Sequence, residues 1–116
     1  MNFSMSYKTI PTPNFAKSLK SLAKRYKSMK DDIKKLCASL EENPLQGSDL
    51  GGGLRKIRMA IDSKGGGKSG GARVITFTVF AEQTTGKVYL LEVYDKSEYS
   101  TVKKDVIKKL LKDLDL

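Results

Sequence analysis

The first third of the chain changes from a strand-like to a helical hydrophobic pattern. Met5–Ile10 has the composition of a short strand, and we expect it to end at Pro11 because proline cannot donate a hydrogen bond to a sheet. From Asn14 onward, apolar residues recur at the spacing of one helical face, namely Phe15, Leu19, Leu22, Ala23 and Tyr26. This spacing predicts an amphipathic helix.

A second helix is predicted to follow directly. Ser28 precedes Asp31 by three residues, which resembles the capping box that opens many helices. The apolar stripe of this helix consists of Ile33, Leu36, Cys37 and Leu40. Asn43 and Pro44 end the helix, because the residue before a proline disfavours helical backbone. Since the connection between the two helices is short, we expect an antiparallel helical hairpin.

The rest of the chain predicts three strands and a final helix. Gly47–Gly53 has the composition of a loop. Apolar residues then alternate along Leu54–Asp62, and Ala72–Phe80 and Lys87–Asp95 are rich in β-branched and aromatic residues, so we expect three strands. Val102–Leu114 carries the apolar stripe of an amphipathic helix.

This order of elements predicts one α+β domain. A chain of 116 residues has the size of a single compact domain, so we assign residues 1–116 to it. Consecutive strands with short connections form antiparallel sheets, and amphipathic helices pack their apolar stripes on them. We therefore expect a small antiparallel sheet of about four strands, with the N-terminal helical hairpin packed on one face and a C-terminal helix.

The composition restricts the chemistry. Lys and Arg number 22 against 13 Asp and Glu, a formal net charge of +9, and so basic a domain is attracted to phosphate polymers. The sequence contains no histidine, which excludes a histidine-activated nucleophile, a histidine general base and histidine-ligated zinc. We expect neither a metal site nor a cofactor.

A cytoplasmic location is expected. Cys37 is the sole cysteine, so an internal disulfide is excluded, which fits a reducing compartment. The sequence has no apolar run near the ~18 residues of a membrane span, and the opening "MNFSMSYKTIP" lacks the segments of a secretion signal. We therefore expect no membrane partner.

The glycine-rich stretch "SKGGGKSGGARV" (Ser63–Val74) is only superficially similar to a nucleotide-binding loop. That pattern requires a glycine where this chain has Asp62. It also requires a helix after the loop, because the N-terminal amides of the helix hold the phosphate, whereas a strand is predicted here. We interpret the stretch as a flexible hairpin tip.

Cations gather on both sides of this tip. Between Leu54 and Arg73 there is one acid, Asp62, against six cations, namely Arg55, Lys56, Arg58, Lys64, Lys68 and Arg73. Strand alternation places Lys56 and Arg58 on one sheet face, and hairpin pairing can bring Arg73 beside them. Such a cluster repels itself unless a phosphate polymer neutralises it. The alternative is an ordinary solvated outer face of an antiparallel sheet.

Three stretches in order, "LRKIRM", "GKSGGARV" and "YDKSE", resemble the RelE/ParE superfamily of bacterial toxins, and within it the HigB-like branch. The resemblance covers nearly the whole chain. It implies the toxin of a type II toxin–antitoxin system, a ribosome-dependent endoribonuclease (mRNA interferase) that cuts mRNA in the decoding site and inhibits translation. The implied partners are a cognate antitoxin protein, which neutralises the toxin in a hetero-oligomer, and the ribosome with its rRNA and mRNA.

The resemblance also implies catalytic residues, because the family's basic positions fall on Lys56, Arg58, Arg73 and Lys96. Lys56 is expected to act as the base, since neighbouring positive charge favours its neutral form. Arg58 and Arg73 would stabilise charge on the phosphorane, and Lys96 would act as the acid or hold a phosphate. Ser97 stands where the family has an arginine.

Further residues are expected to contact RNA, namely Arg55, Lys64, Lys68, Tyr94 and Lys103. Lys64 and Lys68 would bind the rRNA backbone rather than perform chemistry, because a loop lysine is a flexible point charge. Lys103 lies near the position of a family tyrosine. Tyr94 is expected on the strand face opposite Tyr89, Leu91 and Val93, where it could stack on a base.

Two alternatives stay open. The departures at Ser97 and Lys103 leave room for a ParE-like toxin, which inhibits DNA gyrase and needs no nuclease site. An inactive RNA-binding relative is the second alternative. The antitoxin is expected either to cover the basic sheet with an acidic segment or to displace the final helix at Val102–Leu114.

Overall fold

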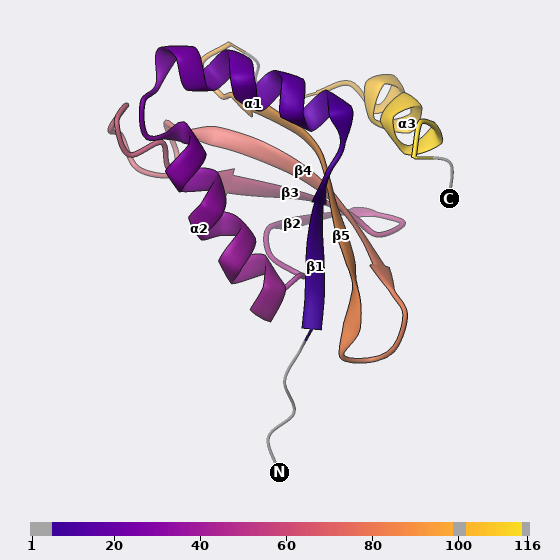
Figure 1. Ribbon diagram of the computed structural model, residues 1–116. Coiled ribbons are helices and arrows are strands. Elements are labelled where there is room, and N and C mark those ends of the chain that lie inside the picture. Colours follow the sequence, from indigo (N-terminus) through magenta and orange to yellow (C-terminus); the bar gives the residue numbers. More distant parts are fainter. Residues whose placement is uncertain (1–5, 99–101, 115–116) are drawn as a thin grey trace.

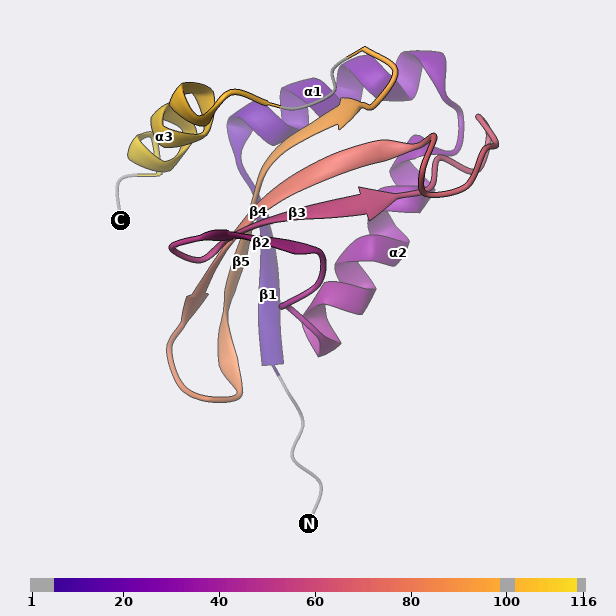
Figure 2. The same ribbon diagram turned by 180° about the vertical axis from the view of Figure 1, so that it is seen from behind.

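The computed structural model describes residues 6–98 and 102–114 and shows a five-stranded sheet flanked by helices (Figures 1 and 2). In chain order the elements are β1 (Ser6–Pro11), α1 (Pro13–Arg25), α2 (Met29–Glu42), β2 (Ser48–Gly51), β3 (Leu54–Met59), β4 (Ala72–Phe80), β5 (Thr85–Asp95) and α3 (Lys104–Lys112). The strand order is β1-β5-β4-β3-β2. β1 runs parallel to β5, and the other neighbouring strands are antiparallel. The predicted α+β class is confirmed.

The sheet gains its fifth strand from the segment that was predicted to be a loop, Gly47–Gly53. Ser48–Gly51 pairs with the start of β3 in a register that ends at Lys56. The glycines of this segment indicated a loop, but they form only the turn and the bulge of a short hairpin. Because β2 is so short, the edge of β3 from Ile57 onward has no neighbouring strand among the described residues.

The two N-terminal helices begin in different ways. At α1 the Thr12 hydroxyl accepts a hydrogen bond from the Phe15 N–H at 3.2 Å, which is the usual N-cap contact. The predicted capping box of α2 is wrong. Ser28 has helical backbone angles, so its hydroxyl does not cap the helix and instead donates to Asp32 at 2.7 Å.

No helix within residues 6–98 and 102–114 has the length and apolar content needed to cross a membrane.

Both faces of the sheet carry an apolar layer. On one face α1 and α2 pack Phe15, Leu22, Met29, Ile33 and Leu40 against Ile57, Met59, Val74, Val88, Leu90 and Val93. On the other face α3 and the residues beside it pack Val102, Leu110, Leu111 and Leu114 against Leu54, Ile75, Phe77, Tyr89, Leu91 and Tyr94. The predicted placement of the helical hairpin on one face is confirmed, and α3 packs against part of the opposite face (Figures 1 and 2).

A bulge in β5 decides which side chains reach each layer. Ile75 pairs with Glu92, but the next residue of β4, Thr76, pairs with Leu90. Leu91 is therefore an extra residue in β5, and it reverses the alternation beyond it. As a result Tyr94 shares the α3 face with Leu91, so its predicted position on the opposite face is wrong.

We expect Gly71 to be required by close packing rather than by a special backbone conformation. A Cβ atom there would lie 2.1 Å from the Met59 carbonyl oxygen, whereas at Gly70 the nearest atom would be 3.4 Å away. Gly71→Ala should lower the free energy of unfolding by about 2 kcal/mol, as overpacking does, and Gly70→Ala should change it little. Urea denaturation measures both, and equal stabilities would contradict this packing argument.

Candidate active site

The pairing of three strands aligns basic residues on the α3 face. Arg58 of β3 lies opposite Arg73 of β4, which lies opposite Tyr94 of β5. Lys56 is two residues before Arg58 and therefore points to the same face. Lys56, Arg58 and Arg73 take part in none of the ion pairs found among the described residues. The structure thus brings the three predicted cations together in adjacent rows of the sheet, on the face that also carries Glu92 opposite Ile75.

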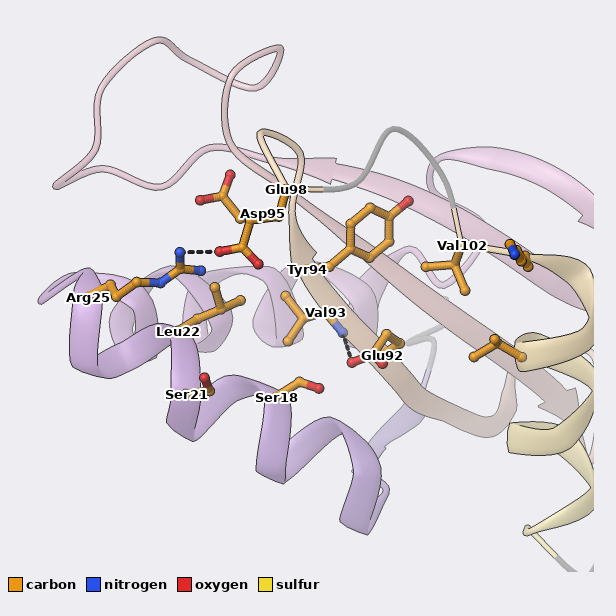
Figure 3. Close-up of a pocket in the computed structure, with 12 residues that line it drawn as sticks. Ser18, Ser21, Leu22, Arg25, Glu92, Val93, Tyr94, Asp95, Glu98 and Val102 are labelled. Atoms are coloured by element: carbon orange, nitrogen blue, oxygen red, sulfur yellow. Dashed lines mark hydrogen bonds and ion pairs between the residues drawn. The ribbon is translucent and has the colours of Figure 1, made fainter.

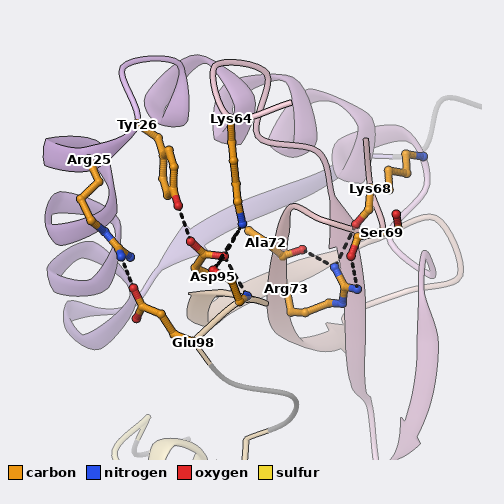
Figure 4. A network of polar contacts seen from close by, with 10 residues as sticks. Arg25, Tyr26, Lys64, Lys68, Ser69, Ala72, Arg73, Asp95 and Glu98 are labelled. Carbon is orange, nitrogen blue, oxygen red and sulfur yellow. Dashed lines mark hydrogen bonds and ion pairs between the residues drawn. The ribbon is translucent and has the colours of Figure 1, made fainter. Parts of the chain in front are cut away.

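Arg73 is the most constrained of these cations. Its side chain is only 6% exposed. Its Nη1 donates to the carbonyl oxygens of Lys68 at 3.0 Å and Ala72 at 3.1 Å, and its Nη2 donates to that of Ser69 at 3.3 Å (Figure 4). Carbonyl groups satisfy the donors without cancelling the charge. Arg73 is therefore a fixed cation with its geometry set before any ligand arrives.

Lys56 and Arg58 border different hollows. Half-buried Lys56 lies in a groove of about 290 Å³ under α3, with Leu50, Leu54, Ile75, Val102, Lys104, Ile107 and Lys108. Exposed Arg58 borders, together with Lys68, a hollow of about 380 Å³ between α2 and the open edge of β3. The predicted cations therefore share a sheet face, but Lys56 and Arg58 border different hollows.

A buried carboxylate lies at the end of β5. Asp95 is 0% exposed, and its Oδ1 accepts hydrogen bonds from Lys64 Nζ at 2.8 Å and from the Ser97 N–H at 2.9 Å and Oγ at 2.8 Å. Its Oδ2 accepts from Tyr26 Oη at 2.5 Å. Burial alone would raise the pKa of Asp95, but the hydrogen bonds from Lys64, Tyr26 and Ser97 outweigh it and hold this pKa well below its usual range.

The Asp95 carboxylate affects the pKa of Tyr26 and the position of the Lys64 ammonium. The hydrogen bond to Asp95, followed by burial and the negative charge, raises the pKa of Tyr26. Lys64 Nζ also lies 5.8 Å from the centre of the Tyr26 ring. Lys64 was expected to contact RNA, but here its ammonium is bonded inward to Asp95 (Figure 4). In this structure, which holds no RNA, Lys64 forms an internal ion pair.

Tyr94 is also less accessible than expected. It is 4% exposed in the layer under α3, and burial is the main cause that raises its pKa. It offers no open ring for a base while α3 lies in place. Arg55 is occupied too, because its Nε and Nη2 donate to the Gln46 and Gly47 carbonyls, both at 3.0 Å.

The remaining predicted cations are exposed. Lys68, Lys96 and Lys103 all lie at the surface. Lys96 lies beside Ser69 at a hollow of about 390 Å³ formed by the loop between β3 and β4. Lys103 lies at a hollow of about 440 Å³ between α1, the end of β5 and the start of α3, and Figure 3 shows this hollow. These three side chains can reach a ligand without any rearrangement of the fold.

The charged residues Arg25, Glu92 and Glu98 at that hollow were not identified from the sequence. Arg25 forms an ion pair with Glu98 (Figure 3), and the Glu92 carboxylate accepts a hydrogen bond from the Val93 N–H at 3.0 Å. The importance of Asp95 was missed as well. The only signal for it is an acid at the end of an apolar strand, which is common at ordinary strand ends.

Comparison with known proteins shows similarity in sequence and in fold. The model of a protein family described as the RelE toxin of the RelE/RelB toxin–antitoxin system matches residues 13–115. Among solved structures, the chain is similar to a double mutant of the E. coli toxin RelE in the free state. The two share 17% sequence identity over 94% of this chain and 98% of that chain, with a TM-score of 0.55. At this identity the likeness concerns the fold.

We expect Asp95 to stabilise the fold at neutral pH and to lose this effect in acid. Its pKa in the folded protein is far below that of an aspartate in an unfolded chain, about 4. Below that pH the unfolded chain binds a proton that folded Asp95 does not, so stability falls. Asp95→Asn should lower the free energy of unfolding by about 3 kcal/mol at neutral pH.

The variant should also depend less on pH than the unsubstituted protein between about pH 5 and pH 2. Urea denaturation at several pH values measures this. The exposed acid Glu82 provides the control, because Glu82→Gln should keep the original acid dependence. A curve for Asp95→Asn parallel to that of the unsubstituted protein would contradict the assignment.

Proposed function

Because the chain belongs to the RelE toxin family, whose model matches residues 13–115, we propose that it is a ribosome-dependent endonuclease that cleaves mRNA. Membership makes it the toxin component of a toxin–antitoxin system, of the kind that inhibits translation, and a gyrase-directed toxin is not favoured. The observation that carries the nuclease proposal is the set of cations Lys56, Arg58 and Arg73 on one sheet face, none of which forms an ion pair among the described residues. The cytoplasm, where ribosomes translate, is the proposed location.

The proposed reaction uses the ribose of the message as its own nucleophile. The 2′-hydroxyl attacks the adjacent phosphorus, and its proton passes to the side-chain nitrogen of Lys56. The bond to the 5′-oxygen breaks, and Lys96 gives this leaving group a proton. The products are a 2′,3′-cyclic phosphate and a 5′-hydroxyl end. A positioned side chain that accepts or donates a proton raises the reaction rate by about 10²- to 10⁴-fold. Lysine is one of the side chains that act in this way, so the reaction does not require histidine.

Arg73 and Arg58 are proposed to stabilise the negative charge that develops on the phosphorane oxygens in the transition state. The carbonyl groups that hold the Arg73 guanidinium support this role, because a donor held in place before the reaction needs little reorganisation during it. Arg73 is only 6% exposed, so it contacts the substrate only after the residues that cover it move. Exposed Arg58 can follow the substrate as it enters. Lys68 and Lys103, both exposed, are proposed to hold rRNA or mRNA phosphates. Tyr94 would reach a base only after α3 moves away.

The groove under α3 supports a contact with the antitoxin. Its floor is apolar and includes Leu50, which is 43% exposed. Its rim carries Lys56, Lys104 and Lys108, and no acid lines it among the described residues. An acidic segment of the antitoxin bound there would pair with these three lysines and block the access of RNA to Lys56. Displacement of α3 by the antitoxin is the second route.

We expect Lys56→Ala and Arg73→Ala to slow the cleavage of mRNA on ribosomes by about 100-fold or more, since each removes a group that acts in the transition state. Primer extension on a message in a reconstituted translation system measures the cleavage. Lys20→Ala is the control, because Lys20 is exposed on α1, on the other face of the sheet.

Cleavage should require ribosomes, and circular dichroism should show that the slow variants are folded. Undiminished cleavage by both variants would reject the site. Inhibition of gyrase supercoiling, with no cleavage of mRNA, would reject the nuclease and favour the ParE-like alternative.

A further inference from the structure

The loop between β3 and β4, Ser63–Gly71, reaches both faces of the sheet, and we call it the glycine loop. Near the start of the loop, Lys64 donates a hydrogen bond to Asp95. Asp95 also accepts a hydrogen bond from the hydroxyl of Tyr26, which follows α1. Near its end, two carbonyl groups of the loop accept hydrogen bonds from Arg73, which lies on the α3 face (Figure 4). One short segment therefore joins the buried carboxylate to the cation of the candidate site.

The start of the glycine loop is firmly attached. The Ser63 N–H donates to Ser28 Oγ at 2.8 Å, and the Ser28 N–H donates to Ser63 Oγ at 3.2 Å. Lys64 adds its bond to Asp95 at 2.8 Å. The loop is thus tied to the connection between α1 and α2 and to the end of β5.

The middle of the loop has little rigidity of its own. Gly65, Gly66 and Gly67 have φ angles of 78°, 83° and 62°, which is left-handed backbone that glycine adopts readily. Glycine also loses more conformational freedom on ordering than any other residue. Such a segment holds the carbonyl groups of Lys68 and Ser69 in place only if its ends are fixed.

A contribution to the stability of the fold is not enough to explain the Lys64–Asp95 ion pair. A buried ion pair is weak grounds for stability, because the loss of hydration offsets much of the attraction. Tyr26 and Ser97 already donate three hydrogen bonds to the Asp95 carboxylate. What Lys64 adds is an attachment of the glycine loop to the sheet.

We propose that Lys64 and Asp95 are positioning residues for Arg73, acting through the glycine loop. The pair fixes the loop, and the loop carbonyls orient the Arg73 guanidinium toward the face that carries Lys56 and Arg58. The effect on cleavage rests on the proposed nuclease function, whereas the effect on Arg73 itself does not.

The test compares Lys64→Met, which removes the ammonium, with Lys64→Arg, which can restore the ion pair. Nitrogen-15 NMR of the Arg73 guanidinium is the structural readout. Restricted rotation of its Nη groups, expected in the unsubstituted protein, should be lost in Lys64→Met and regained in Lys64→Arg. In ribosome assays Lys64→Met should lower kcat by about 10- to 100-fold, as a misplaced catalytic group does, with KM changed less than about twofold.

Lys68→Met is the matched comparison, because it removes an equal charge from the same loop but keeps the backbone carbonyl. It should raise KM and leave the Arg73 signals unchanged. If Lys64→Met fails to fold, Tyr26→Phe weakens the same cluster without leaving an unpaired charge, and it should lower kcat and loosen Arg73 to a smaller extent.

Three outcomes would overturn the proposal: unchanged Arg73 signals in Lys64→Met, a rise in KM alone, or no recovery in Lys64→Arg. A rise in KM alone would make Lys64 an RNA contact, as the sequence predicted. If the unsubstituted protein cuts no mRNA, the nuclease proposal fails, but the NMR comparison still decides whether the pair positions Arg73.

Discussion

The buried carboxylate of Asp95 joins parts of the chain that the sheet alone leaves separate. Tyr26 brings the end of α1, Lys64 brings the glycine loop, and Ser97 fixes the turn after β5. A buried charge is costly unless it is paired and fully hydrogen-bonded, and here four donors satisfy it. The interaction is therefore demanding in geometry, and it holds one end of the sheet in a single arrangement.

The two faces of the sheet differ in what they carry. α1 and α2 bury the larger apolar layer, and the bulge at Leu91 turns Tyr94 to the other side, in line with Arg73. The smaller layer under α3 lies beside the cations. α3 thus belongs to the core and covers Lys56 at the same time, so access to this lysine and packing of the helix are physically linked.

Patterns of local origin were predictable from the sequence. The helical stripes, the three main strands and the shared face of Lys56 and Arg58 follow from periodicity, which depends only on backbone geometry. The pairing of Arg58 with Arg73 followed from a hairpin. What failed depends on long-range contacts. Lys64 meets Asp95 across 31 positions of sequence, and neither residue type in isolation indicates a partner.

Register caused the other errors. A bulge adds one residue without a distinctive sequence signal, so the side of Tyr94 was misjudged. The loop prediction for Gly47–Gly53 weighed glycine content and missed that a short edge strand needs only a few backbone hydrogen bonds. The coverage of the basic face by α3 was not foreseen, because an amphipathic stripe indicates burial but not the face on which it occurs.

The most direct measurement is a cryo-electron microscopy structure of the toxin on a ribosome, with an mRNA that carries a non-cleavable 2′-deoxy nucleotide at the cut site. We expect α3 to be moved from the sheet, Arg73 at the scissile phosphate, and Lys56 Nζ within about 3 Å of the place of the missing 2′-oxygen. A message bound elsewhere on the toxin, with α3 still over Lys56, would contradict the assignment of the basic face as the nuclease site.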